Sequence, residues 1–274
     1  MQQKIYALQH KANLIRNQIL EMIVSAGKGH IGGAFSCTDI LTALYYGDIL
    51  RVDPAHPHWA ERDRFILSKG HAAAALYAVL SDLGFFASAE LRQYGQPGCM
   101  LGGHPDKRIP GVEADTGSLG HGLGLAAGLA FSAKLDRKDF LTVALLGDGE
   151  CCEGSVWEAA MFAAHHQLRG LVAILDQNGQ CVTDYLQDCT ALQPLDQKWQ
   201  AFGWDVRVID GHSFEALLEA LKGLRQRQSA KPLMIVAHTV KGKGVSFMEG
   251  VLDWHHNVPK GAQIEIARKE LTWV

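Results

Sequence analysis

Short apolar runs in the second half of the chain constrain the fold more than any other feature. They lie at residues 141–146, 171–175, 205–209 and 232–237. Runs of this length are typical of strands buried on both faces of a parallel sheet. Helical patterns separate them, at residues 155–167, 196–202 and 213–227. The alternation predicts right-handed βαβ units, and hence an α/β fold whose parallel sheet carries helices on both faces.

The first half of the chain reads as helices joined by glycine-rich turns. A helix is expected over residues 4–26, ending at Gly27, and a second after Ser36, where Ser36 to Asp39 resembles a capping box. Further helices are expected at residues 71–83 and 120–135, with a long loop at 86–112. We expect one domain spanning residues 1–274.

Composition narrows the class of protein. Apolar residues make up 47% of the chain, and 26 basic against 29 acidic residues leave a net charge of −3. No basic surface argues for nucleic acid, and no run of 18 apolar residues or signal-peptide core argues for a membrane or for export. The six cysteines lack paired CxxC spacing, so we expect free thiols rather than a zinc site, in a cytoplasmic protein.

Polar residues follow two of the predicted strands. Gly147-Asp148-Gly149-Glu150 ends the run at 141–146, and Asn178 follows the run at 171–175, 30 residues after Asp148. The carboxyl ends of neighbouring parallel strands share one edge of a sheet, where ligands bind. The glycines allow close approach of a phosphate, and Asp148 is a hard oxygen ligand for Mg²⁺ or Ca²⁺. Taken alone, Gly-Asp-Gly is equally compatible with a simple strand-ending turn.

The pattern of Gly-Asp-Gly, a spacer of this length and then Asn resembles the signature of thiamine diphosphate enzymes. The resemblance implies thiamine diphosphate and Mg²⁺ as cofactors, with Ca²⁺ or Mn²⁺ as alternatives to Mg²⁺. It also implies that the side chains of Asp148 and Asn178 and the backbone carbonyl of Gln180 bind the metal. Gly149 and Glu150 would then contact the cofactor. The doubled Asn of the family is here Gln177-Asn178.

Histidines in glycine-rich contexts narrow the family. They are His30, His71, His104, His121 and His255, the last 14 residues after Lys241. Each alone is more simply a capping or surface residue, but the series resembles the N-terminal half of transketolase, from about residue 10 to about residue 260. That resemblance implies the thiamine diphosphate-binding fold and a ketol-transfer site.

The resemblance also implies roles for individual histidines. His71 would contact the diphosphate, His30 would face the substrate channel, and His104 would hydrogen-bond the hydroxyl on the first carbon of the donor. His255 would touch both diphosphate and substrate, with His256 as the second candidate. His121 stands where family members often carry Gln, so it receives no role.

Other positions follow by the same resemblance. The loop at Gly117, Ser118 and Leu119 would pack near the cofactor ring, and Lys69 and Lys241 would be positive groups at the mouth of the site, Lys241 contacting the cofactor. Glu153 and Glu158 match acids at a subunit interface, although Glu158 is equally compatible with a solvated helix face. For Asp210-Gly211-His212, a helix N-terminus capped by Ser213 is the simpler interpretation.

The implied reaction moves a two-carbon ketol unit from a ketose phosphate to an aldose, and imidazoles suit its proton transfers near neutral pH. In the family a glutamate that activates the cofactor, and arginines that hold the substrate phosphate, lie in a second, pyrimidine-binding domain. We therefore expect that this chain acts only with a C-terminal partner subunit, in an α2β2 assembly. The identity of the ketose donor and of the aldose acceptor stays open.

Three other functions compete with this one. The chain could belong to another thiamine diphosphate enzyme, such as a 1-deoxyxylulose-phosphate synthase-like protein or a dehydrogenase component. It could be a non-catalytic, diphosphate-binding regulatory subunit. A dinucleotide-binding dehydrogenase is disfavoured because no GxGxxG follows a strand with an acidic residue about 20 positions later.

Overall fold

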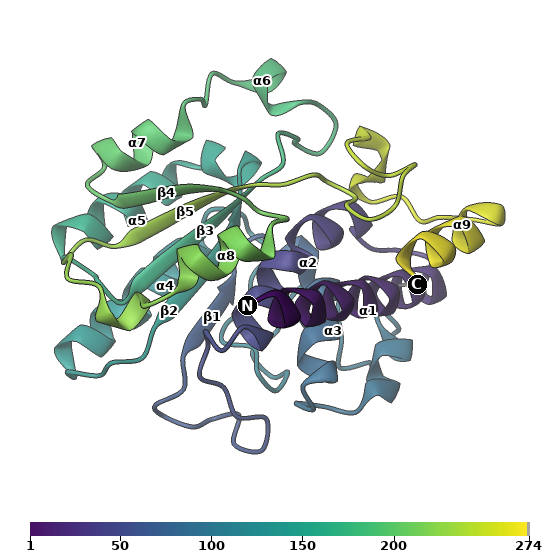
Figure 1. Cartoon of the computed structure of the whole chain (residues 1–274), viewed down its shortest axis with the longest axis horizontal. Coiled ribbons are helices and arrows are strands. Elements are labelled where there is room, and N and C mark those ends of the chain that lie inside the picture. The colour runs from purple at the N-terminus through teal and green to yellow at the C-terminus, as the bar shows by residue number, and fades with distance from the viewer. Residues whose placement is uncertain (273–274) are drawn as a thin grey trace.

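A computed structural model, which describes residues 1–272, contains a five-stranded parallel sheet with strand order β1-β2-β3-β5-β4 (Figure 1). Every neighbouring pair of strands in it runs parallel. The strands are β1 (Arg64–Leu67), β2 (Thr142–Gly147), β3 (Leu171–Gln177), β4 (Asp205–Asp210) and β5 (Leu233–His238). The predicted parallel α/β fold is therefore confirmed.

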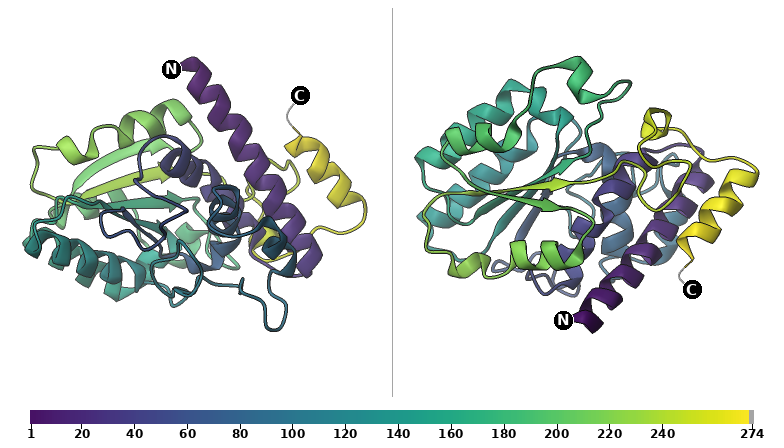
Figure 2. Two further views of the ribbon diagram at one scale, coloured as in Figure 1. Left: turned by 90° about the horizontal axis from the view of Figure 1, so that it is seen from below. Right: turned by 45° about the horizontal axis from the view of Figure 1, so that its top comes forward.

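Helices cover both faces of this sheet (Figure 2). The α-helices are α1 (Gln2–Ala26), α2 (Ile31–Tyr46), α3 (Ala73–Asp82), α4 (Gly122–Leu135), α5 (Gly154–His165), α6 (Leu186–Cys189), α7 (Leu195–Ala201), α8 (Phe214–Leu221) and α9 (Ala262–Leu271). Short 3₁₀ segments are η1 (Gly70–Ala72), η2 (Ser88–Gln93), η3 (Gly149–Cys152), η4 (Leu224–Gln226) and η5 (Leu252–His255). Helices α4, α5 and α7 share one core with the sheet, and α1, α2, α3 and α8 share the other.

Strand β2 shows why the apolar runs are continuous rather than alternating. Val143 and Leu145 belong to the core under α2 and α8, whereas Ala144 and Leu146 belong to the core under α4 and α5. Successive side chains of a strand point to opposite faces. All four are fully buried, so both faces select apolar residues and the pattern becomes one unbroken run.

The start of α2 was predicted wrongly. The helix begins at Ile31, five residues before the expected cap, and Ser36 lies inside it. The Ser36 hydroxyl donates to Asp176 Oδ2 at 2.6 Å, and the Gly33 carbonyl lies 3.1 Å from the same oxygen. Asp39 accepts two hydrogen bonds from Arg16. Polar residues that resembled a helix start are thus buried partners of distant side chains, which no local pattern reveals.

Strand β1 and helices α6 and α9 were not predicted from the sequence. Strand β1 is only four residues long and pairs with β2 at the edge of the sheet. Helix α9 lies along α1, where Arg268 forms an ion pair with Glu21 at 2.6 Å. The expected loop at residues 86–112 is largely irregular but includes η2.

Several element ends agree with the sequence. Helix α1 ends at Ala26, and Gly27 follows it in the left-handed conformation with φ of 65°. The Ser213 hydroxyl accepts from the Ala216 amide and caps α8, as expected. Throughout residues 1–272, no helix is both long and apolar enough to cross a membrane.

Candidate active site

The loops that follow β2, β3 and β5 meet at the carboxyl edge of the sheet and form a pocket of about 110 Å³. We call it the strand-end pocket. It is lined by Gly33, Lys69, His71, Leu119, Gly147, Asp148, Gly149, Glu150, Asn178, Gln180, Cys181, Val182, Lys241 and His255. The register pairs Gly147 with Asp176, which brings the two predicted motifs to one edge.

Asp148 lies on the floor of the strand-end pocket and is 1% exposed. Its Oδ1 accepts from the Gly149 amide at 2.9 Å, and its Oδ2 accepts from the Gly179 amide at 2.6 Å. Burial, aided by the charge of Asp176, raises the pKa of this carboxyl to about 6. A buried carboxylate held in this way favours an added cation, because the cation would offset its lost hydration.

The other two predicted metal ligands lie on the loop after β3. Asn178 Oδ1 accepts from the Gln180 amide at 3.2 Å, and Asn178 Nδ2 donates to Asp176 Oδ1 at 3.3 Å. The Gln180 carbonyl accepts from the Lys241 ammonium at 3.3 Å. Asp148, Asn178 and Gln180 thus supply carboxylate, amide and carbonyl oxygens around one pocket, which is a donor set suited to Mg²⁺.

Two lysine side chains reach this pocket from opposite sides. Lys69 is 1% exposed and forms an ion pair with Asp176 at 2.5 Å. Lys241 is 3% exposed and donates to the carbonyls of Gln180 and Cys181. Burial, together with the charge of Lys69, lowers the pKa of Lys241 to about 8. Both lysines were expected at the mouth of the site, and the structure buries both side chains in the wall of the pocket.

Glu150 lines the pocket, but its carboxylate is occupied by the protein. It accepts from the Ser68 hydroxyl at 2.5 Å, from the Gly120 amide at 2.9 Å and from the Gly147 amide at 3.1 Å. Burial raises the pKa of this carboxyl. Glu150 therefore ties the loops before α3 and α4 to the end of β2.

Four histidines gather above the strand-end pocket, and we call His30, His71, His104 and His255 the histidine cluster. The ring of His30 lies 5.3 Å from that of His71, 6.2 Å from that of His104 and 5.4 Å from that of His255. The ring of His256 lies 6.3 Å from that of His30, but His256 is exposed. Four segments far apart in the sequence therefore place imidazoles around one point.

The environment keeps the imidazoles of His30, His71 and His255 neutral. Burial is the main cause, and neighbouring cations and imidazoles add to it. Together they lower the pKa of His30 to about 4 and that of His255 to about 3, and they hold the pKa of His71 well below its usual value. A neutral imidazole can both accept and donate a hydrogen bond. The buried Nδ1 of His30 has no hydrogen-bond partner among residues 1–272.

Only some residues of the loop before α4 contact the candidate active site. A Cβ at Gly117 would lie 2.8 Å from the His104 ring, so only glycine allows this approach. Leu119 lines the strand-end pocket, whereas Ser118 is exposed and does not line it. His121 is also exposed, with Nδ1 at 3.3 Å from the Leu119 carbonyl. Glu153 and Glu158 are exposed as well.

Two residues that organise the site were given no role in it from the sequence. Asp176 accepts hydrogen bonds from Ser36, Lys69, Asn178 and Thr239 beneath the pocket. His212 Nδ1 lies 2.7 Å from Asp39 Oδ2, and its Nε2 accepts from the Val240 amide at 2.8 Å. Position at a strand end is the signal that could have found Asp176. No local signal marks His212, whose partners lie 173 and 28 residues away.

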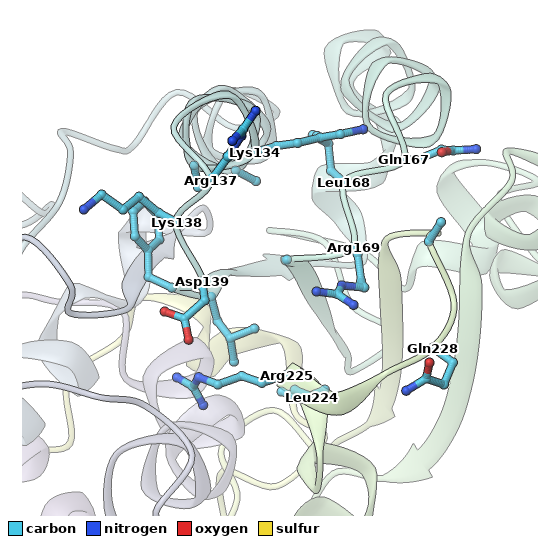
Figure 3. Close-up of a pocket in the computed structure, with 16 residues that line it drawn as sticks. Lys134, Arg137, Lys138, Asp139, Gln167, Leu168, Arg169, Leu224, Arg225 and Gln228 are labelled. Carbon is cyan, nitrogen blue, oxygen red and sulfur yellow. The ribbon is translucent and has the colours of Figure 1, made fainter.

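A larger cavity of about 590 Å³ lies at the opposite, amino ends of β2 and β3 (Figure 3). Its cationic side chains mostly have partners inside the protein. Arg225 pairs with Asp63, Lys138 pairs with Glu61, and the Lys134 ammonium donates to the carbonyl of His166 at 2.6 Å. Asp139 also faces this cavity. It holds none of the predicted site residues, so the candidate active site is the strand-end pocket with its histidine cluster.

Comparison with known proteins shows the family of this chain. The sequence matches the family described as transketolase, thiamine diphosphate binding domain, over residues 8–274. It is 42% identical over 272 residues to one subunit of the apulose-4-phosphate transketolase of Phocaeicola vulgatus, covering 99% of this chain and 95% of that protein. It is 44% identical over 250 residues to a 6-deoxy-6-sulfo-D-fructose transketolase subunit of a Clostridium species, covering 91% and 90%.

A solved structure of a longer protein is also similar. The transketolase of Campylobacter jejuni superposes with a TM-score of 0.92 at 32% sequence identity, over 97% of this chain. The matched region is only 43% of that transketolase. The chain thus corresponds to less than half of a full-length transketolase and to nearly the whole of the two subunits named above.

Proposed function

The chain belongs to the transketolase family by its thiamine diphosphate-binding domain, and from that premise we propose that it is the diphosphate-binding subunit of a two-subunit transketolase. The proposed reaction transfers a two-carbon ketol unit from a ketose phosphate to an aldose. The observation that carries the proposal is the histidine cluster standing over the buried carboxylate of Asp148. A purely structural or regulatory diphosphate site has no need of convergent neutral imidazoles.

The strand-end pocket fits a diphosphate and its metal. Asp148, Asn178 and the Gln180 carbonyl would hold Mg²⁺, and the raised pKa of Asp148 reflects a carboxylate short of a countercharge. Lys241 and His71 would contact diphosphate oxygens from the other side. The close glycines at Gly147 and Gly149 leave room for phosphate groups. Ca²⁺ or Mn²⁺ satisfies the same hard oxygen donors.

Thiamine diphosphate, when bound, supplies the nucleophilic carbon and the electron sink that ketol transfer requires. The protein's part is to orient the sugar and to move protons. Because the pKa values of His30 and His255 lie near 4 and 3, both imidazoles are neutral near pH 7 and can accept a hydrogen bond from a sugar hydroxyl. His104, at the open side of the cluster, is proposed to bind the hydroxyl on the first carbon of the donor.

A second subunit is part of this proposal. Similar chains of nearly the same length are named as individual subunits of transketolases, which implies that each works with another chain. We propose that the partner supplies the pyrimidine-binding half, and that the assembly is α2β2. On this proposal the cofactor lies between the two chains. A cytoplasmic location stays a prediction from the sequence.

The test is reconstitution. The chain is purified alone and with the subunit encoded beside it, and ketol transfer from a ketose phosphate to an aldose is measured with thiamine diphosphate and Mg²⁺. Activity is expected only from the two-subunit assembly, and an Asp148→Ala variant should abolish both cofactor binding and activity. Activity of the isolated chain would refute the split enzyme. Full activity of the assembly with Asp148→Ala would favour the regulatory alternative.

A further inference from the structure

A second cavity, of about 340 Å³, adjoins the histidine cluster. It is lined by Lys28, Gly29, His30, Tyr94, Gly95, Gln96, Cys99, Gly102, Gly103 and His104. His30 and His104 belong both to this cavity and to the histidine cluster, so the cavity extends directly from the proposed reaction centre. It has the position expected for the part of a sugar that lies beyond the reacting carbons.

One residue sets the charge of this cavity. Lys28 is the one lysine or arginine among the lining residues, and no carboxylate lines it. No ion pair or hydrogen bond joins the Lys28 ammonium to any other residue between 1 and 272. An ammonium without a carboxylate partner retains its full capacity for an anionic ligand.

The exposed side chain of Lys28 passes close to Gly95. Gly95 has φ of 68°, and a Cβ there would come within 2.7 Å of Lys28 Cε and 3.5 Å of Lys28 Nζ. The Gly95 amide donates to the Leu101 carbonyl at 2.7 Å, and the Cys99 thiol donates to the same carbonyl at 3.1 Å. These two hydrogen bonds hold the loop from Gly95 to Leu101 together. The aliphatic part of the Lys28 side chain passes over Gly95, and Lys28 lines the cavity.

We propose that Lys28 binds the terminal phosphate of the ketose donor, so that this chain and not only its partner recognises the charged end of the substrate. The inference rests on the proposed function. Lys28 precedes His30 by two residues, which limits the separation of their Cα atoms to about 7 Å. A short sugar chain whose reacting end lies at His30 and His104 therefore places its other end within reach of the ammonium.

The experiment compares donors with and without the phosphate. The two-subunit enzyme is assayed with a ketopentose 5-phosphate and with the same free ketopentose, using wild type, Lys28→Gln and Lys28→Arg. For Lys28→Gln we expect KM for the phosphorylated donor to rise by about 10-fold to 100-fold, as one charge-assisted hydrogen bond is lost, with kcat little changed. KM for the free sugar should stay constant, and Lys28→Arg should recover most of the loss. Lys107→Gln, an exposed lysine outside the cavity, is the matched control.

A binding measurement separates this inference from the proposed function. Inorganic phosphate is titrated into the holoenzyme, and wild type should bind it more tightly than Lys28→Gln, with Lys107→Gln unchanged. If the wild-type assembly transfers no ketol unit but binds phosphate through Lys28, the proposed function is wrong and the phosphate subsite stands. If ketol transfer proceeds and Lys28→Gln affects both donors equally, or neither, the subsite is refuted and the function stands.

Discussion

The ammonium of Lys69 and the carboxylate of Asp176 form an ion pair directly beneath the strand-end pocket, with 2.5 Å between Nζ and Oδ2. Burial is the largest influence and alone would raise the pKa of Asp176 and lower that of Lys69. The partner's charge, together with hydrogen bonds and other nearby charges, outweighs burial, so the pKa of Asp176 is lowered and that of Lys69 is raised. The pair joins the segment before α3 to the end of β3, 107 residues apart. It neutralises the floor of the pocket and leaves Asp148 as the carboxylate in need of a cation.

Removing one partner of this pair should destabilise the chain strongly. Asp176→Ala leaves the Lys69 ammonium buried and unpaired, and we expect a loss of about 3–5 kcal/mol in the free energy of unfolding. Urea denaturation at pH 7 measures it. Glu61→Gln, which removes the solvent-exposed pair with Lys138, is the control and should change stability little. Comparable losses in the two variants would contradict the assigned role of the Lys69–Asp176 pair.

In the absence of metal, the buried carboxylate of Asp148 should lower the free energy of unfolding at pH values above its pKa. Its folded pKa of about 6 lies above the unfolded value of 3.8, so its contribution is fully favourable below pH 3.8 and is lost as pH rises through 6. The penalty at pH 8 is at most about 3 kcal/mol. Asp148→Asn removes this charge, although the amide can accept from only one of Gly149 and Gly179, a loss of about 1 kcal/mol.

The net expectation for Asp148→Asn is a gain of about 1–2 kcal/mol in unfolding free energy at pH 8 in the presence of a chelator. Metal-dependent cofactor binding should be lost at the same time. Urea denaturation and calorimetric titration of thiamine diphosphate measure the two effects. A variant less stable than wild type at pH 8 would show that the carboxylate is not strained by burial.

The histidine cluster should make the chain sensitive to acid. The folded pKa of His30, about 4, lies below the unfolded 6.5, so the unfolded state binds more protons between these values. Stability contributed by the neutral imidazole is thus present above pH 6.5 and falls as pH drops toward 4. His30→Gln removes this term, so the stability difference between wild type and variant should shrink by about 1–3 kcal/mol from pH 7 to pH 4.5.

Asp148 is protonated over the same pH range, and its effect on the free energy of unfolding has the opposite sign. Because Asp148 is present in both proteins, its contribution cancels in the difference between wild type and His30→Gln. His58→Gln, an exposed histidine, is the control. A wild-type minus His30→Gln difference that stays constant from pH 7 to pH 4.5 would show that His30 titrates normally in the folded chain.

His212 should hold the loop after β5 in place. Its Nε2 accepts from the Val240 amide, so Nδ1 carries the proton that is donated to Asp39. His212→Ala removes both bonds, and we expect faster hydrogen exchange at Val240 and about tenfold weaker thiamine diphosphate binding, because Lys241 follows directly. His238→Ala, exposed at the end of β5, is the control. Unchanged exchange at Val240 would show that His212 does not hold this loop.

Activity should distinguish His255 from His256. His255 is 9% exposed and lines the strand-end pocket, whereas His256 is exposed and does not. In the two-subunit enzyme, His255→Ala should lower kcat by about 10²-fold or more, and His256→Ala by much less. Steady-state assays at saturating cofactor measure both. The reverse order would make His256 the functional residue.

Local sequence patterns determined much of this protein. The unbroken apolar runs specify strands buried on both faces, and the glycines after them specify turns. Since carboxyl ends of parallel strands share one edge, the spacing from Asp148 to Asn178 was sufficient to predict that they meet. The order of the histidines along the chain indicated the family.

Tertiary structure alone decided what those residues experience. Ser36 and Asp39 resembled a helix cap but pair with Asp176 and Arg16 inside the protein. Lys69 is buried, and burial is the main cause of the lowered pKa values of His30 and His255. The cavity at Lys28 exists only because a loop some 70 residues later folds over it. Hydrophobic periodicity and turn-forming residues act over a few neighbouring positions, so the sequence shows them directly. Desolvation and ion pairing depend on groups that come together only after the chain has folded.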